Sequence, residues 1–118
     1  MSKTGLIISR IYVDEDDRGD FINIVMTSGD KIIYRDVGRG GHRYFDYVTE
    51  LLDIAPGELF LGAQVIDGYM KDGAEVDFLI LKTTGGAIPI SCVNHNTEYE
   101  GIEIKSRRIK HRETAKYH

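Results

Sequence analysis

Apolar and polar residues alternate along most of this chain with the period of two that is typical of β-strands. In residues 20–27, for example, Ile22, Ile24 and Met26 share one face. Similar runs, rich in β-branched and aromatic residues, recur between glycine-containing turns. The pattern predicts six strands, which are residues 6–13, 20–27, 31–37, 62–69, 75–83 and 87–93. The fold class is therefore mainly β.

The chain contains an internal repeat with an offset of 57 residues, which aligns residues 5–37 with 62–94 without a gap. Seven of the 33 aligned positions are identical, including Tyr12 with Tyr69 and Gly29 with Gly86. The matched glycines occupy turns that need a residue tolerant of positive φ. We therefore predict a duplication of one three-stranded antiparallel meander.

One helix is predicted between the two meanders, over residues 42–54. The apolar residues of this segment recur at helical spacing, and "APG" at residues 55–57 ends the pattern. Two meanders with a helix between them form an α+β fold, either a small barrel or a sandwich. The order β-β-β-α-β-β also agrees with an OB-type barrel.

The C-terminal region gives a weaker pattern. "GIEIKS", residues 101–106, alternates as a seventh strand would, although the repeat would place a second helix nearby; the strand is favoured. Pro89 cannot donate a ladder hydrogen bond, which predicts a sheet edge or a bulge at that position. We expect a single β-rich domain over residues 1–104 and a basic tail over residues 105–118.

Composition excludes several classes of protein. A chain of 118 residues is long enough for one domain, and no apolar run approaches the length of a membrane span. The N-terminal residues lack the features of a secretory signal. Since the single cysteine, Cys92, cannot form an internal disulfide, we expect a reducing compartment and a cytoplasmic protein.

The net charge of −4 conceals an asymmetry along the chain. Residues 1–104 carry 9 basic and 18 acidic side chains, whereas residues 105–118 carry 6 basic and 1 acidic. An acidic body with a basic tail is typical of a protein that contacts other macromolecules electrostatically. The tail residues predicted to contact a partner are Lys105, Arg107, Arg108, Lys110 and Arg112.

The loop "GRGGHR" is the candidate ligand site. Glycines before a helix expose unpaired N–H groups to an anion, and arginine and histidine add charged donors. The predicted anion-binding residues are Arg39, Gly40, Gly41, His42 and Arg43. The sequence matches neither a Walker loop nor a dinucleotide fingerprint, so a turn that needs glycine for its geometry is the alternative interpretation.

Other candidate chemistry gives little support for an enzyme. The acidic segment 14–20 lacks the order of an EF-hand and is interpreted as a hairpin loop. Cys92 and His95 fall on opposite faces of one strand, so they do not form a nucleophile and base pair. The histidines lack the spacing of a metal site, and no cofactor is expected.

The sequence therefore favours a small non-enzymatic binding protein, an inhibitor or regulator that contacts a protein partner through its acidic β surface and basic tail. A homodimer formed through an unpaired strand edge is a further expectation. The alternative is an OB-like binder of single-stranded nucleic acid or a nucleotide, which would use the GRGGHR loop and stack bases on the strand tyrosines Tyr12, Tyr34 and Tyr69.

Overall fold

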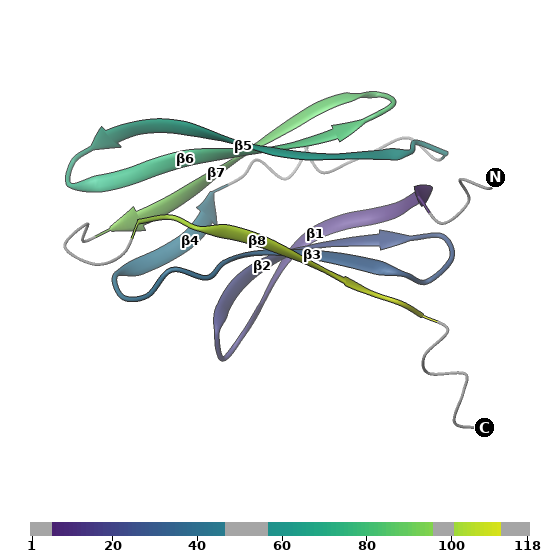
Figure 1. The fold of residues 1–118 in the computed structure, drawn as a ribbon, viewed down its shortest axis with the longest axis horizontal. Helices are drawn as coiled ribbons and strands as arrows, with labels where there is room; N and C mark the ends of the chain where they lie inside the picture. The colour runs from purple at the N-terminus through teal and green to yellow at the C-terminus, as the bar shows by residue number, and fades with distance from the viewer. Residues whose placement is uncertain (1–5, 47–56, 96–100, 112–118) are drawn as a thin grey trace.

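The computed structural model describes residues 6–46, 57–95 and 101–111, and these form a sandwich of two antiparallel sheets (Figure 1). Each sheet has four strands. Sheet 1 contains, in spatial order, β1 (Ile8–Asp16), β2 (Gly19–Met26), β3 (Lys31–Asp36) and β8 (Ile104–Ile109). Sheet 2 contains β4 (His42–Asp46), β7 (Gly86–His95), β6 (Ala74–Thr83) and β5 (Phe60–Lys71).

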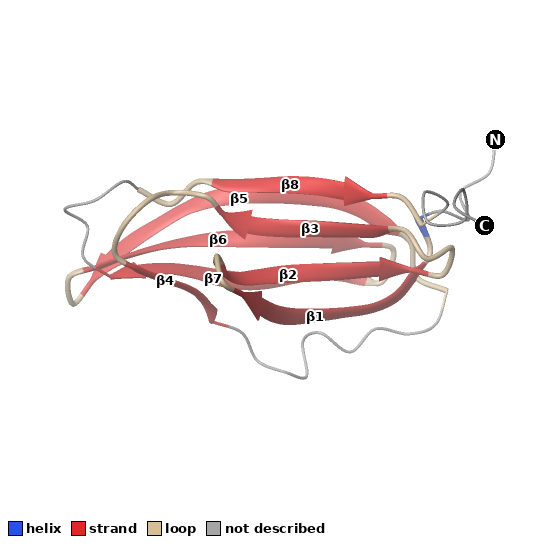
Figure 2. Cartoon of the chain, turned by 90° about the horizontal axis from the view of Figure 1, so that it is seen from below, coloured by secondary structure: helices blue, strands red, loops and turns tan. Residues whose placement is uncertain are grey.

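Each half of the chain forms an antiparallel meander and then gives its fourth strand to the other sheet. Strand β4 follows β3 in the sequence but pairs with β7, and β8 follows β7 but pairs with β3. The connections from β3 to β4 and from β7 to β8 therefore link the sheets in both directions, and residues 37–41 and 101–103 are their described parts. Figure 2 shows the two layers that result.

The core lies between the sheets and is almost entirely aliphatic. Alternation places Ile22, Ile24 and Met26 on the inner face of sheet 1, where their exposures are 0%, 0% and 2%. Leu79, Leu81 and Ile90 oppose them from sheet 2. Burial of these side chains provides the main stabilisation of the sandwich.

The six strands predicted in the two repeats are confirmed, with boundaries within three residues of those expected. The seventh strand is also confirmed, but β8 begins three residues later than the predicted segment. Pro89 lies on a part of β7 that β4 does not reach, because β4 pairs only with Ser91–His95 among the described residues. The strand itself lies between β4 and β6 and pairs with β6 without a bulge, so the predicted edge or bulge is wrong for β7 as a whole, and only the side of Pro89 that faces away from β6 lacks a described partner strand.

The helix predicted over residues 42–54 is wrong for residues 42–46, which form β4. Phe45 points into the core and is 5% exposed, while Tyr44 faces outward, so this segment alternates as a strand. Hydrogen bonding to β7 overrides the helical spacing of the apolar residues. Residues 47–54 lie outside the described part of the chain.

The barrel alternative is not supported either. Two separate four-stranded sheets are present, and the described strands do not close into one barrel. The β-β-β-α-β-β order of an OB-type barrel fails where β4 replaces the start of the helix. Within the described residues no helix is long and apolar enough to cross a membrane.

Candidate functional site

The GRGGHR loop makes the crossover from β3 to β4. Gly40 and Gly41 both have positive φ, 76° and 73°, a conformation that side chains with a Cβ rarely adopt. The loop leads into a strand at His42, so the helix N-terminus on which the anion prediction depended is not present there. The two glycines have a structural role that is independent of any ligand.

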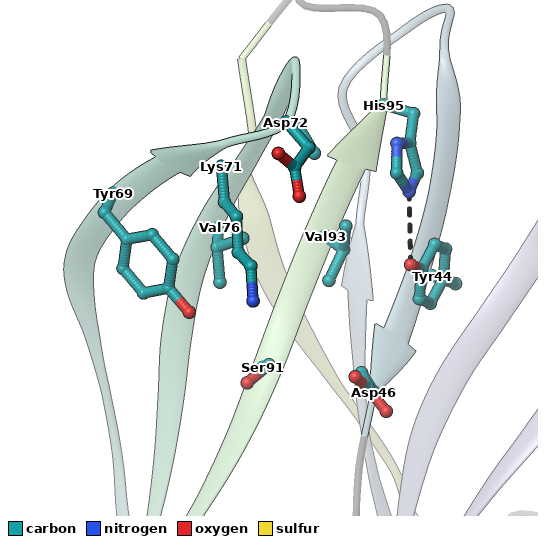
Figure 3. A pocket seen from close by; sticks show the side chains of 10 residues that line it. Tyr44, Asp46, Tyr69, Lys71, Asp72, Val76, Ser91, Val93 and His95 are labelled. Carbon is teal, nitrogen blue, oxygen red and sulfur yellow. Dashed lines mark hydrogen bonds between the residues drawn. The ribbon is translucent and has the colours of Figure 1, made fainter.

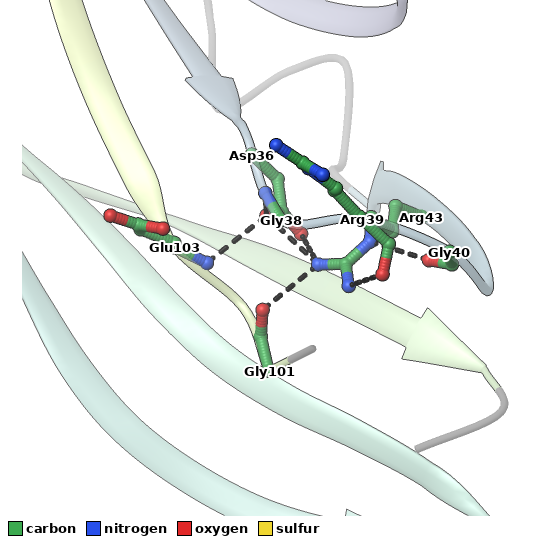
Figure 4. Close-up of polar contacts among 7 residues, drawn as sticks. All are labelled: Asp36, Gly38, Arg39, Gly40, Arg43, Gly101 and Glu103. Atoms are coloured by element: carbon green, nitrogen blue, oxygen red, sulfur yellow. Dashed lines mark hydrogen bonds and ion pairs between the residues drawn. The ribbon is translucent and has the colours of Figure 1, made fainter. Parts of the chain in front are cut away.

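Arg43 is bound by groups of the protein itself (Figure 4). Its Nη1 donates to both carboxylate oxygens of Asp36 at 3.0 Å and to the carbonyl of Gly101 at 3.0 Å. Its Nε and Nη2 donate to the carbonyls of Gly40 and Arg39. The side chains of Arg43 and Asp36 are only 11% and 9% exposed, so this ion pair is largely buried.

Asp36 also holds the two crossovers together. Its Oδ1 accepts hydrogen bonds from the backbone N–H groups of Gly38 and Glu103, both at 3.0 Å. A Cβ at Gly38 would overlap the Arg43 guanidinium and the Gly101 carbonyl oxygen, so only glycine fits there. The cluster Asp36–Gly38–Arg43–Gly101, here called the crossover clamp, satisfies backbone groups where the chain changes sheets.

The other candidate residues of the loop lie apart from the clamp. His42 faces outward and joins an aromatic cluster with Tyr44 and His95, with ring centroids 5.1–6.1 Å apart. Arg39 is exposed in the crossover itself. The structure does not bring His42 and the guanidinium of Arg43 together around one open space, and anion binding by this loop stays a prediction.

A depression of about 240 Å³ lies on the outer face of sheet 2 (Figure 3). Ala74, Val76 and Val93 form an apolar floor, and each is less than 10% exposed. Tyr69 and Lys71 of β5 stand on one side of this floor, and Tyr44 and His95 stand on the other. The hydroxyl of Tyr44 lies 3.2 Å from Nε2 of His95, and this hydrogen bond holds the two side chains together on their side of the depression.

Strand β5 borders this depression and forms the free edge of sheet 2 among the described strands. It is 12 residues long, and its β5–β6 hairpin projects beyond the β1–β2 hairpin of sheet 1 (Figures 1 and 2). All of the exposed large hydrophobic residues in the described chain lie on it: Leu61 (58%), Val65 (44%), Ile66 (43%), Tyr69 (52%) and Met70 (59%).

Three carboxylates lie on the inner side of the same hairpin. Asp67, Glu75 and Asp77 line a depression beside Met70. Asp77 is 7% exposed and accepts a hydrogen bond from the backbone N–H of Gly68 at 3.2 Å. Apolar side chains and negative charge are therefore adjacent at this end of β5.

Cys92 has the environment of a core residue. It is 1% exposed among the aliphatic side chains, and burial raises the pKa of its thiol to about 12, with further contributions from the charges of Asp36 and Asp77. The thiolate is therefore scarce at neutral pH, and His95 faces the opposite side of β7. No group of three potential metal ligands occurs among the described residues.

The residues of the predicted basic tail belong largely to β8. Lys105, Arg107 and Arg108 lie on this strand, whereas Lys110 follows it and Arg112 is outside the described residues. Arg108 bonds the carboxylate of Asp30 at 2.9 Å. Residues 105–109 are therefore part of the sandwich rather than of a separate tail.

The predicted tyrosine platform is not formed, because the three tyrosines lie in different places. Tyr12 is on the outer face of sheet 1, and Tyr69 is on the outer face of sheet 2. Tyr34 packs against the core and contacts Phe60 edge-on, and burial raises the pKa of its hydroxyl.

Comparison with known proteins gives no relative: no family model, no curated protein and no solved structure matches this chain. The β5 edge was not predicted as a site, although the sequence contained a signal for it. Residues 61–66, "LGAQVI", carry no charge and do not alternate with polar residues. Such a run indicates a strand that exposes apolar side chains to solvent on a face or at an edge of the sheet.

Proposed function

We propose that this protein is a non-enzymatic protein-binding module, and that β5 is the element that receives its partner. The observation that carries the proposal is the concentration of all described large exposed hydrophobics on one long edge strand. Natural edge strands are normally short, charged or covered, because a free edge pairs with other chains. The long apolar edge of β5 fits a strand that adds an extended segment of a partner.

The geometry of β5 defines how the segment would pair. The register with β6 is regular between Gly62 and Asp67 and is interrupted on each side by a bulge. Backbone groups of this regular stretch supply the hydrogen bonds, while Leu61, Val65 and Ile66 contact the apolar side chains of the segment. The bulges twist the edge beyond this stretch and so limit the length of the segment.

The charge near β5 selects a basic partner. Asp67, Glu75 and Asp77 lie beside Met70, where a lysine or arginine of the added segment would reach them. A second copy of this chain would instead bring the same carboxylates to the edge and add like-charge repulsion. The occupant is therefore an extended basic and apolar segment of another protein. By binding this segment, the module would inhibit or regulate that protein.

A displayed library of random peptides, selected against the full chain, tests this function. The expected result is enrichment of sequences that alternate apolar residues and contain lysine or arginine. The affinity of a synthetic enriched peptide is then measured calorimetrically with the wild-type protein and with Ile66→Lys, which we expect to bind at least tenfold more weakly.

Ala87→Lys is the matched control, because Ala87 is exposed on β7 of the same sheet but lies away from β5. It should keep wild-type affinity. Asp67→Asn should weaken binding and reduce its salt dependence. Peptides that bind Ile66→Lys as tightly as the wild type would contradict the proposal, as would selection of acidic peptides or self-association that depends on Ile66.

A further inference from the structure

The outer face of sheet 1 carries a second surface, which is separate from β5. Strand register aligns its outward side chains in three rows across the sheet. The rows are Arg10–Val25–Lys31–Ile109, Tyr12–Asn23–Ile33–Arg107 and Asp14–Phe21–Arg35–Lys105. We call these twelve positions the sheet 1 outer face.

This face has a charge opposite to that of the chain. It contains five cations and one carboxylate, whereas the whole chain has a net charge of −4. Arg35 is paired with Asp16 at 2.8 Å, and Lys105 lies 3.5 Å from the exposed Glu103. Arg10, Lys31 and Arg107 have no salt bridge within the described part of the chain, so three cations remain available to phosphates.

Aromatic rings lie between these cations. The guanidinium of Arg10 lies over the ring of Tyr12, 4.2 Å from its centroid, and that of Arg35 lies 4.9 Å from the centroid of Phe21. Flat aromatic and guanidinium groups are the surfaces on which unpaired bases stack. Strand spacing places Tyr12 and Phe21 on adjacent strands, two residues apart in register.

A buried acceptor stands at the centre of the face. Asn23 is 5% exposed, and its Nδ2 donates to the hydroxyl of Tyr12 at 2.8 Å, while its Oδ1 has no donor among the described residues. A buried acceptor without a donor costs free energy, so this position is not optimised for stability alone. Beside it, between β3 and β8, a depression of about 180 Å³ is lined by Arg18, Ile33, Arg35, Val37, Lys105, Ser106 and Arg107.

We infer that the sheet 1 outer face binds single-stranded nucleic acid. Cations would contact phosphates, and Tyr12 and Phe21 would stack on bases. The acidic hairpin at Asp14–Asp17 borders the face and would repel a wider polyanion, such as a duplex or an anionic membrane. A single strand of nucleic acid is narrow enough to follow these rows, since the four β-strands of sheet 1 span only about 14 Å.

Fluorescence anisotropy with labelled (dT)12 and (rU)12 and the full chain tests this inference. Arg10→Ala/Arg107→Ala should lower affinity at least tenfold and reduce the slope of log K against log salt by about 1.4, since two phosphate contacts are lost. Tyr12→Leu should lower affinity about tenfold and leave this slope unchanged, because stacking does not release counterions. Tyr12→Phe, which keeps the ring, should retain most of the binding.

Lys82→Ala is the matched control, because Lys82 is an exposed cation on the outer face of sheet 2. It should bind within twofold of the wild type, and so should Ile66→Lys, which separates this inference from the role of β5. Each variant is checked for an unchanged unfolding midpoint. The inference would be overturned if the wild type bound neither oligonucleotide, or if Lys82→Ala lost as much affinity as the double variant. Tighter binding of a duplex of the same length, or of anionic vesicles, would also overturn it.

Discussion

At the scale of single residues, Arg43 illustrates how a charge that resembles a ligand site can be structural. Its guanidinium is surrounded by Asp36 and by three carbonyl groups of the crossovers. The sequence identified the loop that carries Arg43 but not the groups that bind it, since Gly101 is 58 positions away. The residue type indicated an anion, and the anion present is the carboxylate of the fold itself.

Arg43→Ala should therefore destabilise the protein. Removing one partner of a buried ion pair leaves Asp36 uncompensated, and we expect a loss of about 3 kcal/mol in the free energy of unfolding. Urea denaturation measures this change. Lys105→Ala, which breaks an ion pair between side chains that are 64% and 55% exposed, is the control and should cost less than about 0.5 kcal/mol. Similar small losses in both variants would contradict the structural role of the clamp.

Cys92 gives a second prediction at this scale. Because burial raises the pKa of its thiol to about 12, the native protein should react with a thiol reagent at pH 8 far more slowly than the urea-unfolded chain. The absorbance released from a disulfide reagent follows this reaction. Rapid modification of the native protein would show that Cys92 is accessible and ionised, contrary to its position in the core.

At the scale of elements, β4 is the strand that the sequence did not predict. The helical spacing came from Tyr44 and four apolar residues after position 46, which lie outside the described part of the chain. Within β4 itself Phe45 points inward and Tyr44 outward, which is the alternation of a strand. Five residues are too few for periodicity to separate the two structures. Pairing with β7, whose residues are 45 to 53 positions away in the sequence, decides the outcome.

The other strands were predictable because their burial patterns are local. Residues 22, 24 and 26 are inward in the sequence pattern and inward in the structure. What could not be predicted is which sheet each fourth strand joins, because this depends on contacts between the crossovers. The position of charges along the chain also does not show which cations share a face, since strand register places Arg10, Lys31 and Arg107 together.

The attachment of β8 to the β2–β3 turn should depend on pH. The backbone N–H of His111 and the side chain of Arg108 both bond Asp30, and they hold the pKa of this carboxyl below its ordinary value. The folded state therefore binds fewer protons than the unfolded state, so the contribution is present above about pH 4 and is lost as pH falls below that value.

NMR of the His111 amide measures this effect. Its chemical shift should titrate with a midpoint below about 4, the ordinary aspartate value, and hydrogen exchange should accelerate once Asp30 is protonated. Asp30→Asn should remove this titration. A midpoint at or above the ordinary value would show that Asp30 is not stabilised by these donors.

At the scale of the whole molecule, the exchange of fourth strands makes the two halves depend on each other. Sheet 1 needs β8 from the second half, and sheet 2 needs β4 from the first. The core also takes residues from both halves. Neither half buries its apolar face alone.

Separate fragments covering residues 1–56 and 57–118 should therefore fail to fold individually and should form the sandwich when mixed. The mixture should give the circular dichroism spectrum of a β-sheet protein and near-native dispersion of its amide NMR signals. Each fragment alone should show neither. A cooperative unfolding transition in an isolated fragment would mean that the halves are independent domains.

The two proposed binding surfaces lie on different sheets of the sandwich. Sheet 2 presents an apolar edge with nearby carboxylates, and sheet 1 presents a cationic face with aromatic rings. Under the two proposals, a basic protein segment and an anionic single strand would bind on different sheets of the same domain. The sequence alone favoured one protein partner for the acidic surface and the basic tail, with nucleic-acid binding through the GRGGHR loop as the alternative, whereas the proposals made from the fold use β5 and the sheet 1 outer face.

Backbone hydrogen exchange of the complex with a selected peptide tests the central claim most directly. If the peptide adds as a strand, alternate amides between Gly62 and Asp67 gain protection of at least tenfold, while amides on β1 keep their free rates. Unchanged exchange along β5 in a saturated complex would contradict the assignment of β5 as the binding element.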